Sequence, residues 1–474
     1  MAKRTRPAGM AGFTVIWLGQ FVSMLGSGMT TFAVSIWAWQ ETGQATTLAL
    51  AAFFGFGPQV LLSPLAGALV DRLDRKLVMI LSDLAAGVTT IILLALYSAD
   101  QLEIWHLYAL NAFAGAFASF QFPAYSAAVT VMIPKKQYAR ANGMIGLAGS
   151  ASGIFAPVAA GALIGFIGVG GIMAIDIVTF VFAIGMLLVV FIPSPEQSEE
   201  GRAAAGSLWS ESLFGFRYIY RRPSLLGLQL VFFMLNLIAT LGFTLTAAMV
   251  LARTGSDPLA LSYAQSVGAF GGVAGGLLLS IWGGPKRRIH GVLGGMVLAS
   301  LLSSLPLGIG RSVLWWAVGG FMGGLIIPIL NGSNQAIWQA KVQPDVQGRV
   351  FSIRRLIAQI SAPAAMLAAG PLADNLFEPA MAEGGPGTAA FGWLVGVGPG
   401  AGMGLMFVFA GLLGAAVGLG GYLFPAIRNV EDIMPDHDSE KANGRIGESE
   451  PLSQQPDGLE VLLEPEDPAH SPAD

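Results

Sequence analysis

Long apolar stretches without a charged residue recur along this chain of 474 residues. A helix needs about 20 apolar residues to cross a lipid bilayer, and most of these stretches are long enough. Three further apolar stretches are shorter or contain a charge, and with them the pattern predicts twelve membrane-spanning helices. The uncharged stretches are 7–40, 42–70, 107–134, 141–175, 177–195, 223–252, 258–285, 312–340 and 384–427, and the further three are 77–99, 291–310 and 356–373.

Residues 141–195 are too many for one crossing, so we expect two helices there. Glycines cluster from Gly165 to Gly171, and glycine adopts backbone conformations that break a helix at little steric cost. The hinge between the two helices is predicted in this cluster. The fold class is therefore an all-α membrane protein.

An internal repeat with a spacing near 206 residues divides the protein into two similar parts. We expect two six-helix halves related by pseudo-symmetry, with a substrate site near the membrane midplane at their interface. The repeat aligns Pro123 with Pro328, Lys135 with Lys341 and Pro157 with Pro363. The expected segments are an N-terminal stretch 1–10, the halves 11–193 and 224–425, a linker 194–223 with an amphipathic helix, and an acidic tail 426–474.

Basic residues are distributed very unequally between the two sides of the predicted bundle. If the N-terminus is cytoplasmic, 23 Lys and Arg residues lie on the cytoplasmic side, and only Arg253 and Arg311 lie outside. Short basic loops are seldom translocated across a membrane. Both termini are therefore predicted to be cytoplasmic.

The composition agrees with a membrane protein, since 54% of the residues are hydrophobic and only 11% are charged, against about 25% in soluble domains. The net charge of −4 conceals a strongly acidic tail, with 13 acidic and three basic residues in 426–474. We expect a disordered, solvated extension there; a tail that binds a partner is the alternative. The chain contains no cysteine, so neither disulfides nor thiolates contribute.

The segment GALVDRLDRK, from Gly67 to Lys76, is a charged loop between two apolar stretches. Gly67 permits close helix approach, and Asp71 can accept hydrogen bonds from a helix N-terminus or pair with a cation. Arg72, Arg75 and Lys76 suit an anionic inner membrane surface. The simpler alternative to a functional role for this loop is a plain positive-inside anchor, but an anchor needs no aspartate.

GALVDRLDRK resembles the signature loop between the second and third helices of the major facilitator superfamily. GIFAPVAAG, from Gly153 to Gly161, resembles the fifth-helix motif of its drug:proton antiporters. KVQPDVQGRVFSIRR, from Lys341 to Arg355, resembles its macrolide-efflux and enterobactin-export branch. The resemblance covers about residues 10 to 435. It implies a secondary active exporter in the bacterial inner membrane, which moves a macrolide-like drug or a siderophore by alternating access in exchange for protons.

The charged loop and the family motifs suggest roles for particular residues. A charge cluster such as that of Gly67, Asp71, Arg72, Arg75 and Lys76 can latch the cytoplasmic side when the pump faces outward, and we predict this role for the loop. Two departures from the family pattern occur, because Asp74 replaces the usual glycine of the signature loop and Asn111 replaces an arginine of the antiporters' fourth helix. The residues of the helix-5 motif and its helix-11 counterpart are Gly153, Pro157, Gly161 and Pro363.

Polar residues three or four positions apart mark one face on every third predicted helix. Unpaired amides are costly in hydrocarbon, so these faces should meet one another or water, and we predict that they line the substrate cavity. Tight helix packing is the alternative explanation for the Ser and Thr residues. The cavity candidates are Gln20, Ser23 and Ser27; Asn111 and Ser119; Asn236 and Thr240; and Asn331 and Gln335.

Asp176 is the acidic residue predicted to lie well inside a span. A carboxyl group within the membrane is a functional hypothesis because it can take up and release a proton, although it can also serve only as a hydrogen-bond partner for a neighbouring helix. Glu41, at the outer end of the first span, is a second candidate for proton coupling. No Lys, Arg or His lies deep in a predicted span, which favours an amphipathic or cationic substrate over an anionic one.

Other function classes find little support. The phosphate-binding pattern GxxxxGK[ST] of a primary pump is missing, and no cluster of His or carboxylates has metal-ligand spacing. We therefore expect no enzyme, cofactor, metal or nucleic-acid partner, and a monomer whose partners are a small-molecule substrate, the proton and membrane lipid. The open alternatives are a lysophospholipid or lipid flippase of the same superfamily and a non-transporting membrane sensor.

Overall fold

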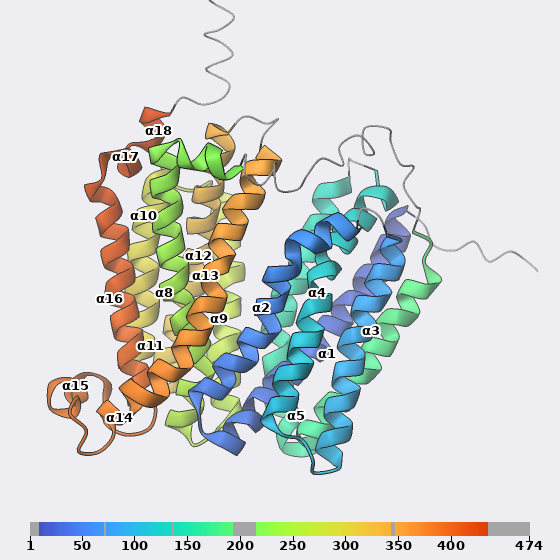
Figure 1. Ribbon diagram of the computed structural model, residues 1–474, viewed down its shortest axis with the longest axis horizontal. Coiled ribbons are helices and arrows are strands. Elements are labelled where there is room, and N and C mark those ends of the chain that lie inside the picture. The colour runs from blue at the N-terminus through green and yellow to red at the C-terminus, as the bar shows by residue number, and fades with distance from the viewer. Residues whose placement is uncertain (1–8, 71–72, 135–136, 193–214, 343–346, 435–474) are drawn as a thin grey trace, which may run out of the picture.

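The computed structural model describes residues 9–70, 73–134, 137–192, 215–342 and 347–434 (Figure 1). The regular elements in these ranges are helices, and no strand occurs among them. The first half contains α1 (Gly9–Thr42), α2 (Ala45–Val70), α3 (Arg75–Ser98), α4 (Ile104–Met132) and α5 (Tyr138–Val189). The second half contains α8 (Pro223–Thr254), α9 (Pro258–Trp282), α10 (Arg288–Ala299), η2 (Ser300–Ser304), α11 (Leu305–Ile309), α12 (Val313–Lys341), α13 (Gln347–Leu372), η3 (Ala373–Phe377), α14 (Glu378–Met381), α15 (Thr388–Val395), α16 (Ala401–Leu423), α17 (Pro425–Arg428) and α18 (Val430–Ile433).

Local sequence signals set several helix ends. Pro223 and Pro258 stand in the first turns of α8 and α9, where a proline costs no hydrogen bond. Gly255 and Gly283 follow the ends of these helices in the left-handed conformation, which glycine adopts without steric strain. These two helices are therefore bounded by residues that favour their ends.

The described helices agree with the predicted twelve crossings. Ten of them are long and apolar enough to span a membrane. One of the ten, α5, has 52 residues and holds two crossings, and α4, with 29 residues, is also long enough for one. The predicted hinge is confirmed at Gly168, whose φ of 66° and ψ of −179° interrupt α5.

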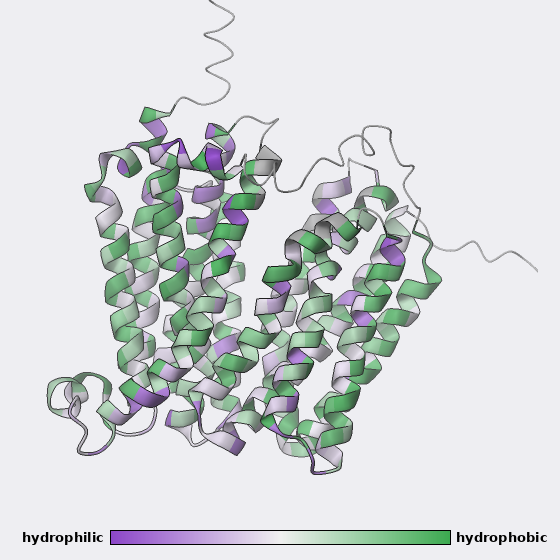
Figure 2. Cartoon of the chain, in the orientation of Figure 1, coloured by the Kyte–Doolittle hydropathy of each residue, from purple (hydrophilic) through white to green (hydrophobic). Residues whose placement is uncertain are grey.

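The two halves lie side by side, with α1–α5 in one group and α8–α16 in the other (Figure 1). Hydrophobic residues dominate the long helices, and hydrophilic residues gather mostly towards their ends (Figure 2). Large apolar side chains point outward, including Phe166, which is 87% exposed, and Ile281, which is 86% exposed. A surface of this kind is stable only against lipid, so the chain is a multi-pass membrane protein.

The most extensive contacts between the halves are those of α2 with α13 and of α5 with α9, and α2 also contacts α8. Glycines allow both pairs to approach closely. A Cβ atom at Gly161 would lie 2.8 Å from the Cβ of Ser262, and one at Gly370 would lie 2.4 Å from the Cα of Thr46. Residues of both halves also share one buried apolar cluster, which includes Ala160 and Ala264.

The two ends of the bundle differ in charge and in packing. We call one end the basic end; it carries Arg75, Lys76, Arg287, Arg288 and Lys341 near the first turns of α3 and α10 and the last turn of α12. At the opposite end lie the α1–α2, α3–α4 and α14–α15 connections. The halves come together at the opposite end and diverge towards the basic end (Figure 1).

The linker and the tail lie largely outside the described residues. Residues 193–214 and 435–474 are not described, so the predicted amphipathic helix is seen only in part. Residues 215–220 are helical, Ile219 is buried in the core of the second half, and the guanidinium of Arg222 lies 3.6 Å from the centroid of the Tyr218 ring. The described part of the linker thus packs against the second half.

Candidate functional site

Two carboxylates are buried among the helices of the first half. Asp83 lies in the third turn of α3 and is 8% exposed, and Asp176 lies in the part of α5 that follows the hinge and is 3% exposed. Burying a carboxylate in an apolar bundle is costly unless polar groups face it. The groups that face these two carboxylates therefore define a candidate site.

Amide groups surround Asp83. Gln20 of α1 donates from Nε2 to Oδ2 of Asp83 over 2.8 Å, and Gln121 of α4 donates from Nε2 to Oδ1 over 2.9 Å. The same Gln121 nitrogen also lies 3.0 Å from Oε1 of Gln20. Three helices thus contribute one side chain each to a closed triangle of hydrogen bonds.

Hydroxyl groups surround Asp176. Ser27 of α1 donates to Oδ1 over 3.1 Å, and Thr90 of α3 donates to Oδ2 over 2.9 Å. Gly26 permits this contact, because a Cβ atom there would lie 2.8 Å from Oδ1 of Asp176 and 2.1 Å from Oγ1 of Thr179. Any larger residue at Gly26 would push α1 away from the carboxylate.

The two clusters form successive layers between α1 and α3, and each layer is completed by a residue of a third helix, Gln121 of α4 or Asp176 of α5. Gln20 and Ser27 are seven residues apart on α1, and Asp83 and Thr90 are seven apart on α3. Seven residues make about two helical turns, or about 10 Å, so both members of each pair lie on one face. The first half therefore contains two polar layers between α1 and α3, each with one carboxylate.

The structure brings some of the predicted residues together and separates others. Asp176 and Ser27 are in contact, and Gln20 contacts Asp83 instead of standing alone on a cavity wall. Glu41 is exposed in the last turn of α1, away from both layers along the helix. Ser23 is half-buried on α1 between Gln20 and Ser27.

Several cavity candidates bond to backbone carbonyls of their own half. Asn111 donates to the carbonyl of Ala51 over 3.1 Å and so links α4 to α2. Ser119 donates to the carbonyl of Ala116 within α4, and Asn236 donates to that of Phe232 within α8. Each of these side chains thus has a hydrogen-bond partner within its own half. Thr240 is half-buried on α8, and Asn331 is exposed on α12.

Arg354 lies just before the predicted span 356–373, but it belongs to a longer described helix. The candidate span 353–381 includes it, because α13 begins at Gln347 and continues through the charged segment. Arg354 donates to Oε1 of Gln335 over 2.7 Å, and its guanidinium lies 5.0 Å from the centroid of the Trp338 ring. These contacts offset part of the cost of burying a cation.

Residues 74–76, in the described part of the charged loop, form hydrogen bonds within the first half. Asp74 caps α3 by accepting from the backbone N–H of Leu77 over 2.9 Å. Arg75 donates to the carbonyl of Ala127, and Lys76 donates to those of Leu188 and Val190. Asp71 and Arg72 lie outside the described residues, so the latch stays a prediction.

The helix-5 motif lies at the contact between halves. Pro157 is inside α5, one turn after Gly153, and a Cβ atom at Gly153 would lie 3.6 Å from the Cβ of Ala269 in α9. Pro363 occupies the corresponding place inside α13, which packs against α2. Both motifs are therefore in the helix pairs that connect the halves.

Sequence reasoning missed Asp83 and Gln121 as members of the site. Asp83 stands only nine residues into α3, near enough to a basic loop to suggest a position at the membrane surface. The available signal was the spacing of seven between Asp83 and Thr90, which places an acid and a hydroxyl on one helix face. Gln121 offered no comparable signal within its own helix.

Comparison with known proteins places this architecture in a family. The family model of the Major Facilitator Superfamily matches residues 16–366. Macrolide efflux protein A of Streptococcus pyogenes is 26% identical over 367 residues, which cover 77% of this chain and 90% of that protein. The enterobactin exporter EntS of Shigella boydii serotype 18 is 24% identical over 231 residues, which cover 48% of this chain and 53% of that protein.

A solved structure shows the same fold. A bacterial homologue of the human lysosomal transporter Spinster, in an inward-facing and unoccupied conformation, matches with a TM-score of 0.63 at 15% identity, covering 86% of this chain and 96% of its own. The all-α architecture and the resemblance to macrolide and enterobactin exporters are thereby confirmed. Because the family model spans most of the chain, this protein is a transporter that belongs to the Major Facilitator Superfamily.

Proposed function

We propose that this protein is a secondary active exporter of an amphipathic small molecule, a macrolide-like drug or a siderophore, driven by proton entry. The names of its relatives support export, because both macrolide efflux protein A and EntS are exporters. The bundle operates by alternating access, with the substrate between the two halves near the membrane midplane. The protein lies in the bacterial inner membrane, with the basic end and both termini in the cytoplasm.

The two buried carboxylates carry the proposal. Among the described residues, amides and hydroxyls face Asp83 and Asp176, and no cation lies within ion-pairing distance of either. Neutral partners stabilise a carboxylate less than a cation does, so each group can lose its charge by binding a proton. Asp176 is the main proton carrier, Asp83 is a second one, and exposed Glu41 has a subordinate role.

One atom in the Asp83 layer favours proton uptake there. Oε1 of Gln121 is buried and has no hydrogen-bond partner among the described residues. A buried acceptor without a partner is costly. A protonated carboxyl group carries an O–H donor that an ionised one lacks, so protonation of Asp83 supplies a donor next to this oxygen.

The energy of one proton suffices for transport. A single charge that moves inward through ~100 mV releases about 2.3 kcal/mol, which supports a roughly 50-fold gradient of a neutral solute. The cavity is lined by the polar faces of α1, α4, α8 and α12. Arg354 beside Gln335 adds a positive charge at the basic end of the second half, which the substrate passes on entry from the cytoplasm.

The proposal is tested by accumulation of a labelled macrolide and a cationic dye in cells that lack their own pumps. Cells with the protein should accumulate less of at least one compound, and collapse of the proton gradient should abolish the difference. Asp176→Asn should reduce gradient-dependent export at least tenfold, and Asp83→Asn should reduce it less.

Asp257→Asn is the matched control, because this aspartate caps its own helix at the opposite end, where it accepts from the N–H of Leu259 over 2.9 Å. It should export normally. Full gradient-dependent export by the Asp176→Asn protein would exclude Asp176 as the proton carrier. If the intact protein changes the accumulation of neither compound, the drug substrate is wrong, and siderophores and lysophospholipids are tested next.

A further inference from the structure

Asp374 connects the two halves at the opposite end of the bundle. It belongs to η3, directly after α13, in the second half. Its Oδ1 accepts from the backbone N–H of Ala45 over 3.0 Å, and its Oδ2 accepts from that of Thr46 over 2.7 Å. Both donors are in the first turn of α2, in the first half. Both oxygens of this carboxylate thus accept hydrogen bonds from the other half.

The contact supplies α2 with a cap that its own sequence lacks. The first N–H groups of a helix have no partner inside the helix, and a carboxylate there also interacts favourably with the helix dipole. The residue before α2 is Gln44, which is not among the residue types preferred at helix N-caps, whereas α9 is capped by its own Asp257. The N-terminus of α2 receives two hydrogen bonds from the second half.

Packing fixes the position of this cap. Gly370 lies one turn before Asp374, and a Cβ atom there would be 2.4 Å from the Cα of Thr46. The backbones of α2 and α13 are thus in direct contact beside the hydrogen bonds. Separation of the halves at this end would break both the packing and the cap together.

Two charged residues near Asp374, Glu378 and Arg253, form their hydrogen bonds within the second half. Glu378, one turn further along, accepts from the backbone N–H groups of Gly400 and Met403. Arg253, which interacts electrostatically with Glu378, donates to the carbonyls of Gly400 and Val395. These two residues hold α8, α14 and α16 to one another, so Asp374 is the carboxylate of this group that reaches across.

We propose that Asp374 is a positioning residue for transport, which holds the opposite end of the bundle closed by capping α2 across the interface between the halves. The path to that side opens only when the carboxylate leaves the N-terminus of α2. Loss of the cap favours the state that is open at the opposite end by roughly tenfold, the effect of losing one helix cap. This role rests on the proposed alternating access, but it concerns conformation and does not depend on which substrate is carried.

The experiment measures the distance between the halves directly. The chain has no cysteine, so spin labels can be attached at two introduced ones, Gln101→Cys in the α3–α4 connection and Glu383→Cys in the α14–α15 connection. Both residues are exposed and lie away from α2. Double electron–electron resonance on the purified protein in lipid nanodiscs then reports how far the opposite end is open.

Asp374→Ala should shift the distribution towards longer distances, with about a tenfold change in the ratio of open to closed states. Asp257→Ala, which removes a cap within one half, should leave the distribution unchanged. Asp374→Asn, which keeps one acceptor oxygen, should give an intermediate shift and serves as the test if the alanine variant does not fold. An unchanged distribution in the Asp374 variants, or an equal shift in Asp257→Ala, would overturn the proposal.

Transport assays separate this inference from the proposed function. A protein that exports neither compound but opens on loss of Asp374 supports the gate and refutes only the assignment of substrate. A protein that exports a drug while the distances in the Asp374 variants stay unchanged refutes the gate alone.

Discussion

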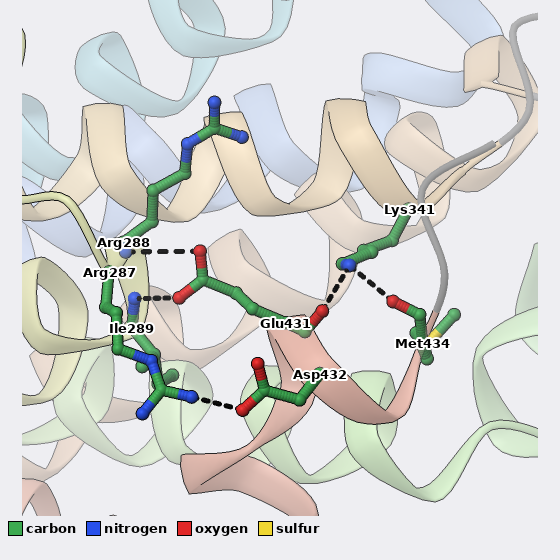
Figure 3. Close-up of polar contacts among 7 residues, drawn as sticks. All are labelled: Arg287, Arg288, Ile289, Lys341, Glu431, Asp432 and Met434. Carbon is green, nitrogen blue, oxygen red and sulfur yellow. Dashed lines mark hydrogen bonds and ion pairs between the residues drawn. The ribbon is translucent and has the colours of Figure 1, made fainter. Parts of the chain in front are cut away.

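The helices α3 and α10 begin at the same end of corresponding halves, yet their first turns are capped in different ways. Asp74, the residue just before α3, accepts from the N–H of Leu77. Before α10 stands Arg287, which makes no capping bond; instead, Glu431 of α18 accepts from the N–H groups of Arg288 and Ile289 over 3.2 and 3.0 Å. Figure 3 shows this carboxylate reaching the helix start from the C-terminal segment.

The capping of α10 by Glu431 holds the C-terminal segment, residues 425–434, against the second half. Lys341, at the end of α12, donates to the backbone carbonyls of Glu431 and Met434, and Arg287 forms an ion pair with Asp432 (Figure 3). Ile427 and Val430 are buried in the core of the second half. In the first half, the residue next to α3 provides the cap. In the second half, the cap of α10 comes from α18, which packs with α17 at the basic end.

Removal of the C-terminal helices α17 and α18 should cause the largest loss of stability in the second half. A chain that ends at residue 424 loses the cap of α10 and the burial of Ile427 and Val430, which together stabilise the second half by several kcal/mol, since each buried aliphatic side chain contributes about 1.5–3 kcal/mol. We expect a large fall in melting temperature in detergent. A chain that ends at residue 434 keeps these contacts and should melt like the full chain; equal melting of both truncated chains would show that α17 and α18 add no stability.

Removal of a single capping residue should destabilise the protein less, and the loss should be larger for the cap of α10 than for that of α3. Glu431→Ala should destabilise the protein by about 1–2 kcal/mol and Asp74→Ala by about 1 kcal/mol, because Glu431 also orients α18. Hydrogen exchange at the amides of Ile289 and Leu77 measures each cap separately. Arg287→Ser gives α10 a local cap, so it should reduce the cost of Glu431→Ala; an undiminished cost would mean that capping is not what Glu431 contributes.

The smallest effect is expected for the ion pair between Arg287 and Asp432. The two side chains are 47% and 63% exposed, and exposed pairs contribute about 0–1 kcal/mol. Asp432→Ala should therefore change the melting temperature little, and less still at high salt. A loss as large as that of Glu431→Ala would show that the pair, and not the cap, fastens α18.

The sequence predicted those features that depend on neighbouring residues. Hydrophobic stretches gave the twelve crossings, and a local glycine cluster placed the hinge that occurs at Gly168. The same local reasoning singled out Asp176 but gave no partner for it beyond its own helix. Contacts such as those of Asp176 with Ser27 and Thr90 join residues 149 and 86 positions apart, which no periodicity reveals.

The features that were missed depend on pairing between distant helices. Asp83 stands near the start of its predicted span, and its environment depends on the amides of Gln20 and Gln121 from two other helices. Arg354 lies just before the predicted span 356–373, whereas α13 extends through it and Gln335 and Trp338 contact its guanidinium. The contact of Asp374 with Thr46 bridges 328 positions and requires the halves to be docked.

The separation of 143 residues between the start of α10 and its capping residue Glu431 sets an order of events during biosynthesis. The first half contains its own cap for α3, so that helix can be finished as soon as its residues leave the ribosome. The start of α10 remains uncapped for longer, because its capping carboxylate is synthesised 143 residues later. Until Glu431 is made, the N–H groups of Arg288 and Ile289 lack this carboxylate partner, so the second half is completed later than the first.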